Sequence, residues 1–173
     1  MEKFYGQLEQ DKFIYDRYFK NYSKGISIEC GAFDGVMESS TYFFEETLGW
    51  VTINIEASPP IFDMLETNRK NSININKGLS DQNDMLIFEH AIHPNHGVKF
   101  GNGSFNHKTS HRQILVSENC KFEKHEVETT TYKELIDTLM EDKFPKQEVD
   151  LFVLDVERFE IEAQAAAALN HPN

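Results

Sequence analysis

Segments typical of β-strands alternate with segments of helical periodicity, and this order constrains the fold more than any other feature of the chain. The strand candidates are residues 26–28, 51–55, 73–77, 85–89, 126–131 and 149–154. The helix candidates are residues 7–22, a segment directly after Gly35, and residues 59–69 and 132–140. Residues 149–154 are nearly all apolar, as expected for a strand that is covered on both faces in a parallel sheet. The alternation predicts an α/β fold with a Rossmann-like, doubly wound and mostly parallel sheet.

Length and composition predict one soluble domain that spans residues 1–173. Hydrophobic residues make up 39% of the chain, which is enough for a core. The net charge of −12 disfavours binding to nucleic acid. No stretch approaches the roughly 20 apolar residues that span a bilayer, and the N-terminus has no basic region followed by an apolar core. The chain has only two cysteines and they lie far apart, so we expect reduced thiols and a cytoplasmic protein. From the charge and the absence of a spanning segment, we expect neither nucleic-acid nor membrane partners.

A glycine turn follows the first strand candidate and carries two carboxylates, Glu29 and Asp34. Gly31 would let the backbone approach a ligand closely, because a side chain there would occupy the place of the ligand. A pyrophosphate site favours a G-x-G-x-x-G pattern without anionic residues. Carboxylates instead attract a ligand with an ammonium and a sulfonium, such as S-adenosylmethionine. The turn therefore favours S-adenosylmethionine over NAD, and an ordinary glycine turn without a ligand is the alternative.

Glu56 ends the second strand candidate, at the position after the glycine turn where an acidic residue accepts hydrogen bonds from ribose hydroxyls. Its two oxygens can take both hydroxyl protons. The alternative is a solvated glutamate at a strand end. Together with the turn, Glu56 favours a cofactor site.

Several segments, which include these two sites, occur in a fixed order along the chain. They are residues 7–13 (Q-x-x-Q-D-x-F), 28–35, 39–41, Glu45, 49–50, 55–59, 79–81 and 155–160. In this ordered run the chain resembles the FkbM family of methyltransferases, which use S-adenosylmethionine and have a Rossmann-like sheet. Phe33 stands where the family usually has Asn, and Arg158 stands where it has Gly. From the residues alone, we expect Glu45 and Glu46 to lie on an ordinary solvent-exposed helix surface.

The resemblance implies a methyltransferase whose acceptor is a small hydroxylated molecule, such as a sugar or a natural product. The implied cofactor-binding residues are Glu29, Gly31 and Gly35 at the methionine part, Glu56 at the ribose, Ser80 and Asp81 at the adenine, Asp155 facing the methyl group, and Ala32 and Ala57 beside them.

Asp155 and Glu157 are the candidate catalytic residues. Methyl transfer is an in-line displacement, and a hydroxyl acceptor must also lose a proton. Residues two apart in an extended segment project to one side, so both carboxylates could enter the crevice as a base or as a metal pair. The alternative is that Asp155 only contacts the cofactor and Glu157 is structural. We expect no metal.

Histidines also recur in this chain, at positions 90, 93 and 96 and again at 107 and 111. Three-residue spacing without partnering cysteines is a weak zinc signal, so a solvent-exposed or acceptor-side role is favoured. Residues 93–112 are rich in glycine and polar residues and predict a mobile loop. His107 or His111 on such a flap is an alternative base.

The C-terminal part departs from the family pattern. Only 19 residues follow Leu154, whereas this fold ordinarily continues with three more strands, so we expect a sheet that lacks its C-terminal strands. A truncated chain, a degenerate gene or a swapped homodimer would each account for this. Arg158 places a positive charge beside a cationic sulfonium. A catalytically inactive binding or scaffold module is therefore the alternative to an enzyme, whereas a nicotinamide oxidoreductase fits the strand order but not the acidic turn.

Overall fold

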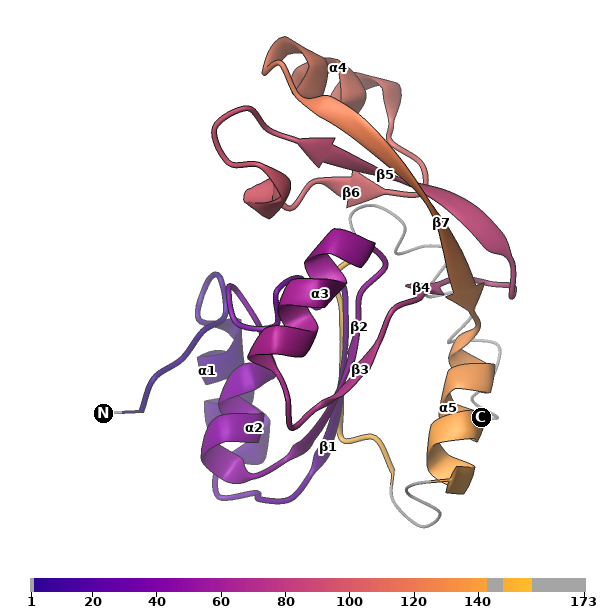
Figure 1. Ribbon diagram of the computed structural model, residues 1–173. Helices are drawn as coiled ribbons and strands as arrows, with labels where there is room; N and C mark the ends of the chain where they lie inside the picture. The colour runs from indigo at the N-terminus through magenta and orange to yellow at the C-terminus, as the bar shows by residue number, and fades with distance from the viewer. Residues whose placement is uncertain (1, 143–147, 157–173) are drawn as a thin grey trace.

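The computed structural model describes residues 2–142 and 148–156, and it contains a parallel sheet below a second, mainly antiparallel sheet (Figure 1). The strands of the parallel sheet, in order across it, are β3 (Ile73–Ile75), β2 (Val51–Ile55), β1 (Ile26–Cys30) and β8 (Leu151–Leu154). At the centre of this sheet, Ile28 lies between Ile53 on β2 and Phe152 on β8. The carboxyl ends of β1, β2 and β8 therefore meet at one edge, as the sequence predicts for a mostly parallel sheet.

Strand β1 has one apolar face and one polar face, and both are buried. Ile26, Ile28 and Cys30 belong to the main core, together with Ile53, Ile55 and two leucines of the last helix. Ser27 and Glu29 point to the opposite face, because side chains alternate along a strand. Alternation of this kind usually marks a strand with one face in water. Here the polar face needs buried hydrogen-bond partners instead.

Helices cover both faces of the parallel sheet. They are α1 (Gln10–Ile14), which continues into a π-helical turn (Tyr15–Phe19), α2 (Tyr42–Leu48), α3 (Pro59–Asn68) and α5 (Tyr132–Asp142). In Figure 1, α1, α2 and α3 lie on one side of this sheet and α5 lies on the other. Prolines at the first turn of α3 suit a helix start, since those N–H groups have no partner within the helix. No helix in residues 2–142 and 148–156 is long and apolar enough to cross a membrane.

The second sheet differs from the expectation that all strand candidates join one sheet. Its order is β4 (Gly78–Leu79), β7 (Lys121–Thr130), β5 (Met85–Ile92) and β6 (Gly103–Ser104). Strands β5 and β7 pair antiparallel along their length, from Met85 opposite Glu128 to Ile92 opposite Lys121. The physical reason lies in β7, where charged residues alternate with less polar ones, which is typical of an antiparallel strand with one solvated face.

Two local expectations are also corrected. The helical segment expected after Gly35 begins only at Tyr42. Residues 93–112 contain a short 3₁₀ helix (Val98–Phe100), strand β6 and the start of α4 (Thr109–Ser117). Leu115 of α4 is buried against Ala91 of β5 and Cys120, so this segment packs on the second sheet rather than forming one long loop.

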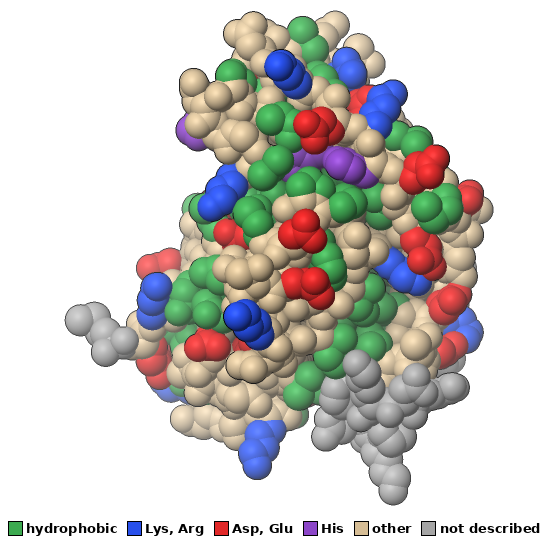
Figure 2. Space-filling view, viewed as in Figure 1, with side chains coloured by type: hydrophobic (Ala, Val, Ile, Leu, Met, Phe, Trp, Pro, Cys, Tyr) green, Lys and Arg blue, Asp and Glu red, His purple; other side chains and the backbone are tan. Residues whose placement is uncertain are grey.

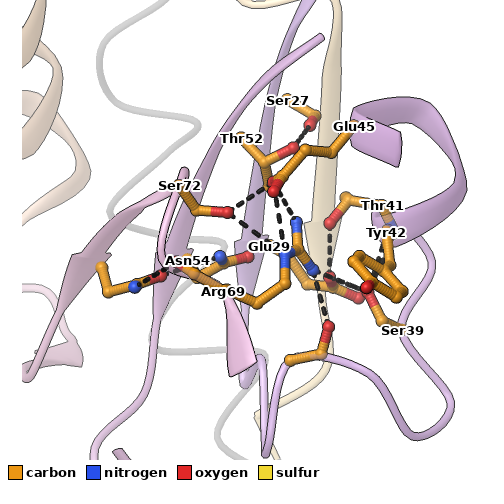
Figure 3. Close-up of polar contacts among 12 residues, drawn as sticks. Ser27, Glu29, Ser39, Thr41, Tyr42, Glu45, Thr52, Asn54, Arg69 and Ser72 are labelled. Carbon is orange, nitrogen blue, oxygen red and sulfur yellow. Dashed lines mark hydrogen bonds and ion pairs between the residues drawn. The ribbon is translucent and has the colours of Figure 1, made fainter. Parts of the chain in front are cut away.

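Arg69, directly after α3, is buried and holds the segment that connects β1 to α2 (Figure 3). Its Nη2 lies 2.6 Å from Oε2 of Glu45, and its Nη1 donates to the carbonyl of Gly35 at 2.7 Å. The guanidinium also lies over the ring of Tyr42, 4.7 Å from its centroid. The expectation of an ordinary helix surface is therefore wrong for Glu45, whose carboxylate side chain is only 10% exposed.

Replacing Arg69 by Met should destabilise the protein by about 3–5 kcal/mol, because the buried carboxylate of Glu45 loses its ion-pair partner. Urea unfolding followed by circular dichroism measures this change. The matched control is Lys12→Met, which removes an exposed ion pair with Asp16 and should change stability by less than about 1 kcal/mol. Equal losses in the two variants would show that the Arg69 pair does not organise this part of the fold.

Candidate functional site

A cavity of about 740 Å³ opens at the carboxyl ends of β1, β2 and β8. One side of the cavity is formed by residues 29–33, 55–58 and 151–156 of the parallel sheet and its loops. The other side is formed by Phe88 and His90 of the second sheet, together with Lys99 and residues 101–105. Figure 2 shows hydrophobic and histidine side chains gathered at the level where the two sheets meet. The cavity therefore lies where ligands bind in open α/β sheets.

The Gly31 turn is shaped by a contact within the protein. Gly31 has a φ of 78°, and its N–H donates to the carbonyl of Ile55 at 2.9 Å. A Cβ atom on Gly31 would lie 1.7 Å from the carbonyl oxygen of Asp155. Glycine is thus required here because the backbone after β8 approaches closely, whereas the sequence suggested only a ligand as the reason. Ala32 is buried next to it and lines the cavity.

Glu29 lines the cavity, but its carboxylate is bound to the protein. It accepts hydrogen bonds from the hydroxyls of Ser39 and Thr41, at 2.7 and 2.6 Å, and from the N–H of Ser40 at 2.7 Å. Burial raises the pKa of Glu29, and these three donors oppose that rise. Figure 3 shows the Glu29 and Arg69 groups meeting at Ser39. Glu29 therefore fixes the segment that forms one wall of the site.

Glu56 is buried too, but its donors are backbone N–H groups rather than hydroxyls. Its Oε2 accepts the N–H of Phe33 at 3.0 Å, and its Oε1 accepts the N–H of Ser58 at 2.8 Å. Burial raises the pKa of Glu56 to about 7, although these backbone N–H groups partly oppose the rise. Within the described part of the chain, no cation forms an ion pair with this carboxylate. A cationic ligand in the cavity would favour its ionised form.

The raised pKa of Glu56 makes stability depend on pH. Burial disfavours the ionised form of Glu56 in the folded protein, so the protonated form stabilises the fold. This stabilisation is complete below the ordinary pKa of 4.5 and is lost as pH rises through about 7. Between about pH 4 and pH 8, the free energy of unfolding of the wild type should fall by about 3 kcal/mol relative to Glu56→Gln, since one pKa unit equals 1.36 kcal/mol. Urea titrations of both ligand-free proteins across this range measure the difference. Parallel pH profiles would contradict it.

His90 is a cavity residue that the sequence pattern assigned to a solvent-exposed or acceptor-side role. It is 1% exposed, its Nδ1 lies 2.8 Å from Oγ of Ser58, and its Nε2 lies 2.9 Å from the carbonyl of Val98. Among the described residues, no group of three His, Cys, Asp or Glu side chains is arranged to hold a metal ion. The alternation of side chains along β5 places His90 on the face that meets the parallel sheet. Histidine spacing alone did not reveal this position.

A further wall comes from the N-terminal segment. Gln7, Gln10 and Ile14 line the cavity beside Met37 and Glu38, and a β-bridge joins Gly6 to Glu38. The Q-x-x-Q-D-x-F pattern marked this segment, but the sequence gave no reason to place it at the site. Its two glutamines add carboxamides, which both donate and accept hydrogen bonds.

The structure brings six of the expected cofactor-binding residues to this one cavity: Glu29, Gly31, Ala32, Glu56, Ala57 and Asp155. Gly35 lies outside its wall, where a Cβ atom would meet Leu65 and Arg69. Ser80 and Asp81 follow β4 and are not part of the wall either, and the N–H of Ser80 donates to the carbonyl of Thr130. Glu157 and Arg158 lie outside the described residues.

The comparisons with known proteins agree with this geometry. A family model described as the methyltransferase FkbM domain matches residues 29–165, which include the end of β1, all of β2 and β8, and both glutamates at the strand ends. Neither the curated proteins nor the solved structures contain a match to the chain. Since the family model covers more than half of the sequence, the chain belongs to the FkbM methyltransferase family.

Proposed function

We propose that this protein is an S-adenosylmethionine-dependent methyltransferase that methylates a hydroxyl oxygen of a small acceptor, such as a sugar or a natural product. The observation that supports this most strongly is one cavity that joins the Gly31 turn, the Glu56 carboxylate and Asp155 at the ends of three adjacent parallel strands. The family model supplies the class of reaction.

The residues of the cavity fit a cofactor of this size and charge. Its volume of about 740 Å³ falls within the range of about 300–1,000 Å³ that is typical of small-molecule sites. The described wall carries the carboxylates of Glu29, Glu38, Glu56 and Asp155 and the ammonium groups of Lys77 and Lys99. Because Glu56 is buried without a cation partner in this part of the chain, a ligand with an ammonium and a sulfonium suits the site better than a pyrophosphate.

S-adenosylmethionine, when bound, supplies an electrophilic methyl group. The protein then has to bind and orient both reactants. Each oxygen of an ionised Glu56 has more than one lone pair, so this carboxylate would accept hydrogen bonds from ribose hydroxyls. The backbone of Gly31 and Ala32 would line the methionine part, and Glu29 would hold that turn through Ser39 and Thr41.

Asp155 is the proposed proton acceptor. It follows β8 at the edge of the cavity and is exposed, as a residue that meets an entering acceptor must be. A hydroxyl bound beside its carboxylate would transfer a proton to it as the oxygen is methylated. Gln7, Gln10 and Glu38 line the same cavity and offer hydrogen bonds to further hydroxyls of the acceptor. Glu157 stays a candidate from the sequence alone, as do the homodimer, the cytoplasmic location and the exclusion of nucleic-acid and membrane partners.

Titration calorimetry with S-adenosylhomocysteine tests the proposal. The wild type should bind this ligand, and Glu56→Gln should weaken binding by about 10- to 100-fold, because the ribose hydroxyls lose a charged hydrogen-bond acceptor. The matched control is Glu66→Gln on the exposed surface of α3, which should bind as the wild type does.

NAD serves as the second ligand in the same experiment and should show no binding. The assignment fails if the wild type binds NAD in preference to S-adenosylhomocysteine. It also fails if Glu56→Gln and Glu66→Gln bind S-adenosylhomocysteine equally well.

A further inference from the structure

A second groove lies on the N-terminal helical segment, apart from the cavity. This groove, which we call the α1 groove, has a volume of about 420 Å³ and is lined by Leu8, Glu9, Lys12, Phe13, Asp16 and Arg17. None of these residues lines the cavity, which the same segment meets through Gln7, Gln10 and Ile14. In Figure 1, α1 lies on the side of the molecule opposite to α5. The proposed function gives the α1 groove no role.

Large apolar side chains are exposed along this segment. Leu8 is 85% exposed and Phe13 is 65% exposed, and Tyr18, five residues further on, is 67% exposed. The segment is already anchored to the fold by Tyr15, which is buried in a cluster with Phe43. A single exposed apolar side chain is common, whereas several on one short segment mark an interaction site.

The charges of the α1 groove leave one acid and one base without an ion-pair partner. Nζ of Lys12 lies 2.5 Å from Oδ2 of Asp16, so these two charges neutralise each other. Neither Glu9 nor Arg17 forms an ion pair with any residue that the structure describes. Eight positions separate the two, which is about 12 Å along a helix. The groove therefore has a negative end and a positive end.

Phe13 lies midway between these ends, four residues after Glu9 and four before Arg17. When two identical helices cross antiparallel at a shared residue, each residue before the crossing faces the one that lies equally far after it in the other copy. A crossing at Phe13 would place Glu9 of each copy against Arg17 of the other, and Leu8 against Tyr18. The α1 groove is thus complementary to itself in charge and in apolar surface, as a two-fold interface requires.

We propose that two copies of this chain form a two-fold dimer through the α1 groove, with Phe13 at the centre and a Glu9–Arg17 pair on each side. This dimer needs no exchange of strands between the copies. Because the groove and the cavity share no lining residue, the interface and the proposed reaction use different surfaces. A different protein would have to match both charges and the apolar centre, whereas a second copy carries all three by symmetry.

Sedimentation equilibrium of the wild-type chain tests whether this dimer exists. We expect a monomer–dimer equilibrium with a dissociation constant in the micromolar range or below. Phe13→Ala should raise the dissociation constant at least about tenfold, because an aromatic side chain at the centre of an interface contributes strongly and counts twice here. The control Met85→Ala removes an exposed apolar side chain of β5 and should leave the equilibrium unchanged. A wild type that stays monomeric throughout the micromolar range would overturn the inference.

Charge reversal tests the antiparallel pairing. Glu9→Arg and Arg17→Glu should each raise the dissociation constant at least about tenfold, because like charges then face each other on both sides of the two-fold axis. An equal mixture of the two variants should form a heterodimer with the wild-type affinity, since each copy then supplies the charges that the other needs. The control Lys70→Glu changes the net charge as Arg17→Glu does, at an exposed position after α3, and should dimerise as the wild type does.

The outcomes separate this interface from other arrangements. If the wild type dimerises but neither charge reversal weakens the dimer, another surface forms it and the inference fails. It also fails if mixing the two variants does not recover the wild-type affinity. If a different protein occupies the α1 groove, the pure chain stays monomeric, which contradicts the inference too. The proposed function is tested separately, because its calorimetric measurement with S-adenosylhomocysteine needs no dimer.

Discussion

The ion pair between Arg69 and Glu45 is the interaction on which the site depends. It is buried, and it is linked through the Gly35 carbonyl and Ser39 to the segment that follows β1. That segment supplies the donors that satisfy Glu29. Because an unpaired buried charge is strongly unfavourable, the groups of this network support one another. The backbone at the end of β1 is thereby fixed before any ligand binds.

The two glutamates at the strand ends differ in what the protein offers them. Glu29 accepts hydrogen bonds from two hydroxyls and one N–H, whereas Glu56 accepts them from backbone N–H groups and pairs with no cation in the described part of the chain. Glu29 is thus held by side chains of the fold, whereas the buried carboxylate of Glu56 has no ion-pair partner in the described part of the chain. Functional sites often hold a group in such an unfavourable state, because a ligand of the right chemistry relieves it. This difference separates a structural carboxylate from a binding one.

The sequence predicted the parallel sheet and its polar strand ends because periodicity and glycine turns are local signals. It could not show that Gly31 is needed for the backbone of Asp155, because that contact joins residues that are 124 positions apart. The pairing of β5 with β7 is also non-local, and β5 resembles a short strand of any sheet. For the same reason, His90 was grouped with His93 and His96 by spacing, although the fold pairs it with Ser58. Arg69 gave no signal, since one arginine at a helix end is usually solvated.

A crystal structure of the protein with S-adenosylhomocysteine tests the central claim most directly. The account predicts that the ligand fills the cavity, with its ribose hydroxyls at hydrogen-bond distance from the carboxylate of Glu56 and its amino acid part beside Gly31 and Ala32. A ligand bound elsewhere, or one in this cavity whose ribose leaves Glu56 without a partner, would contradict it.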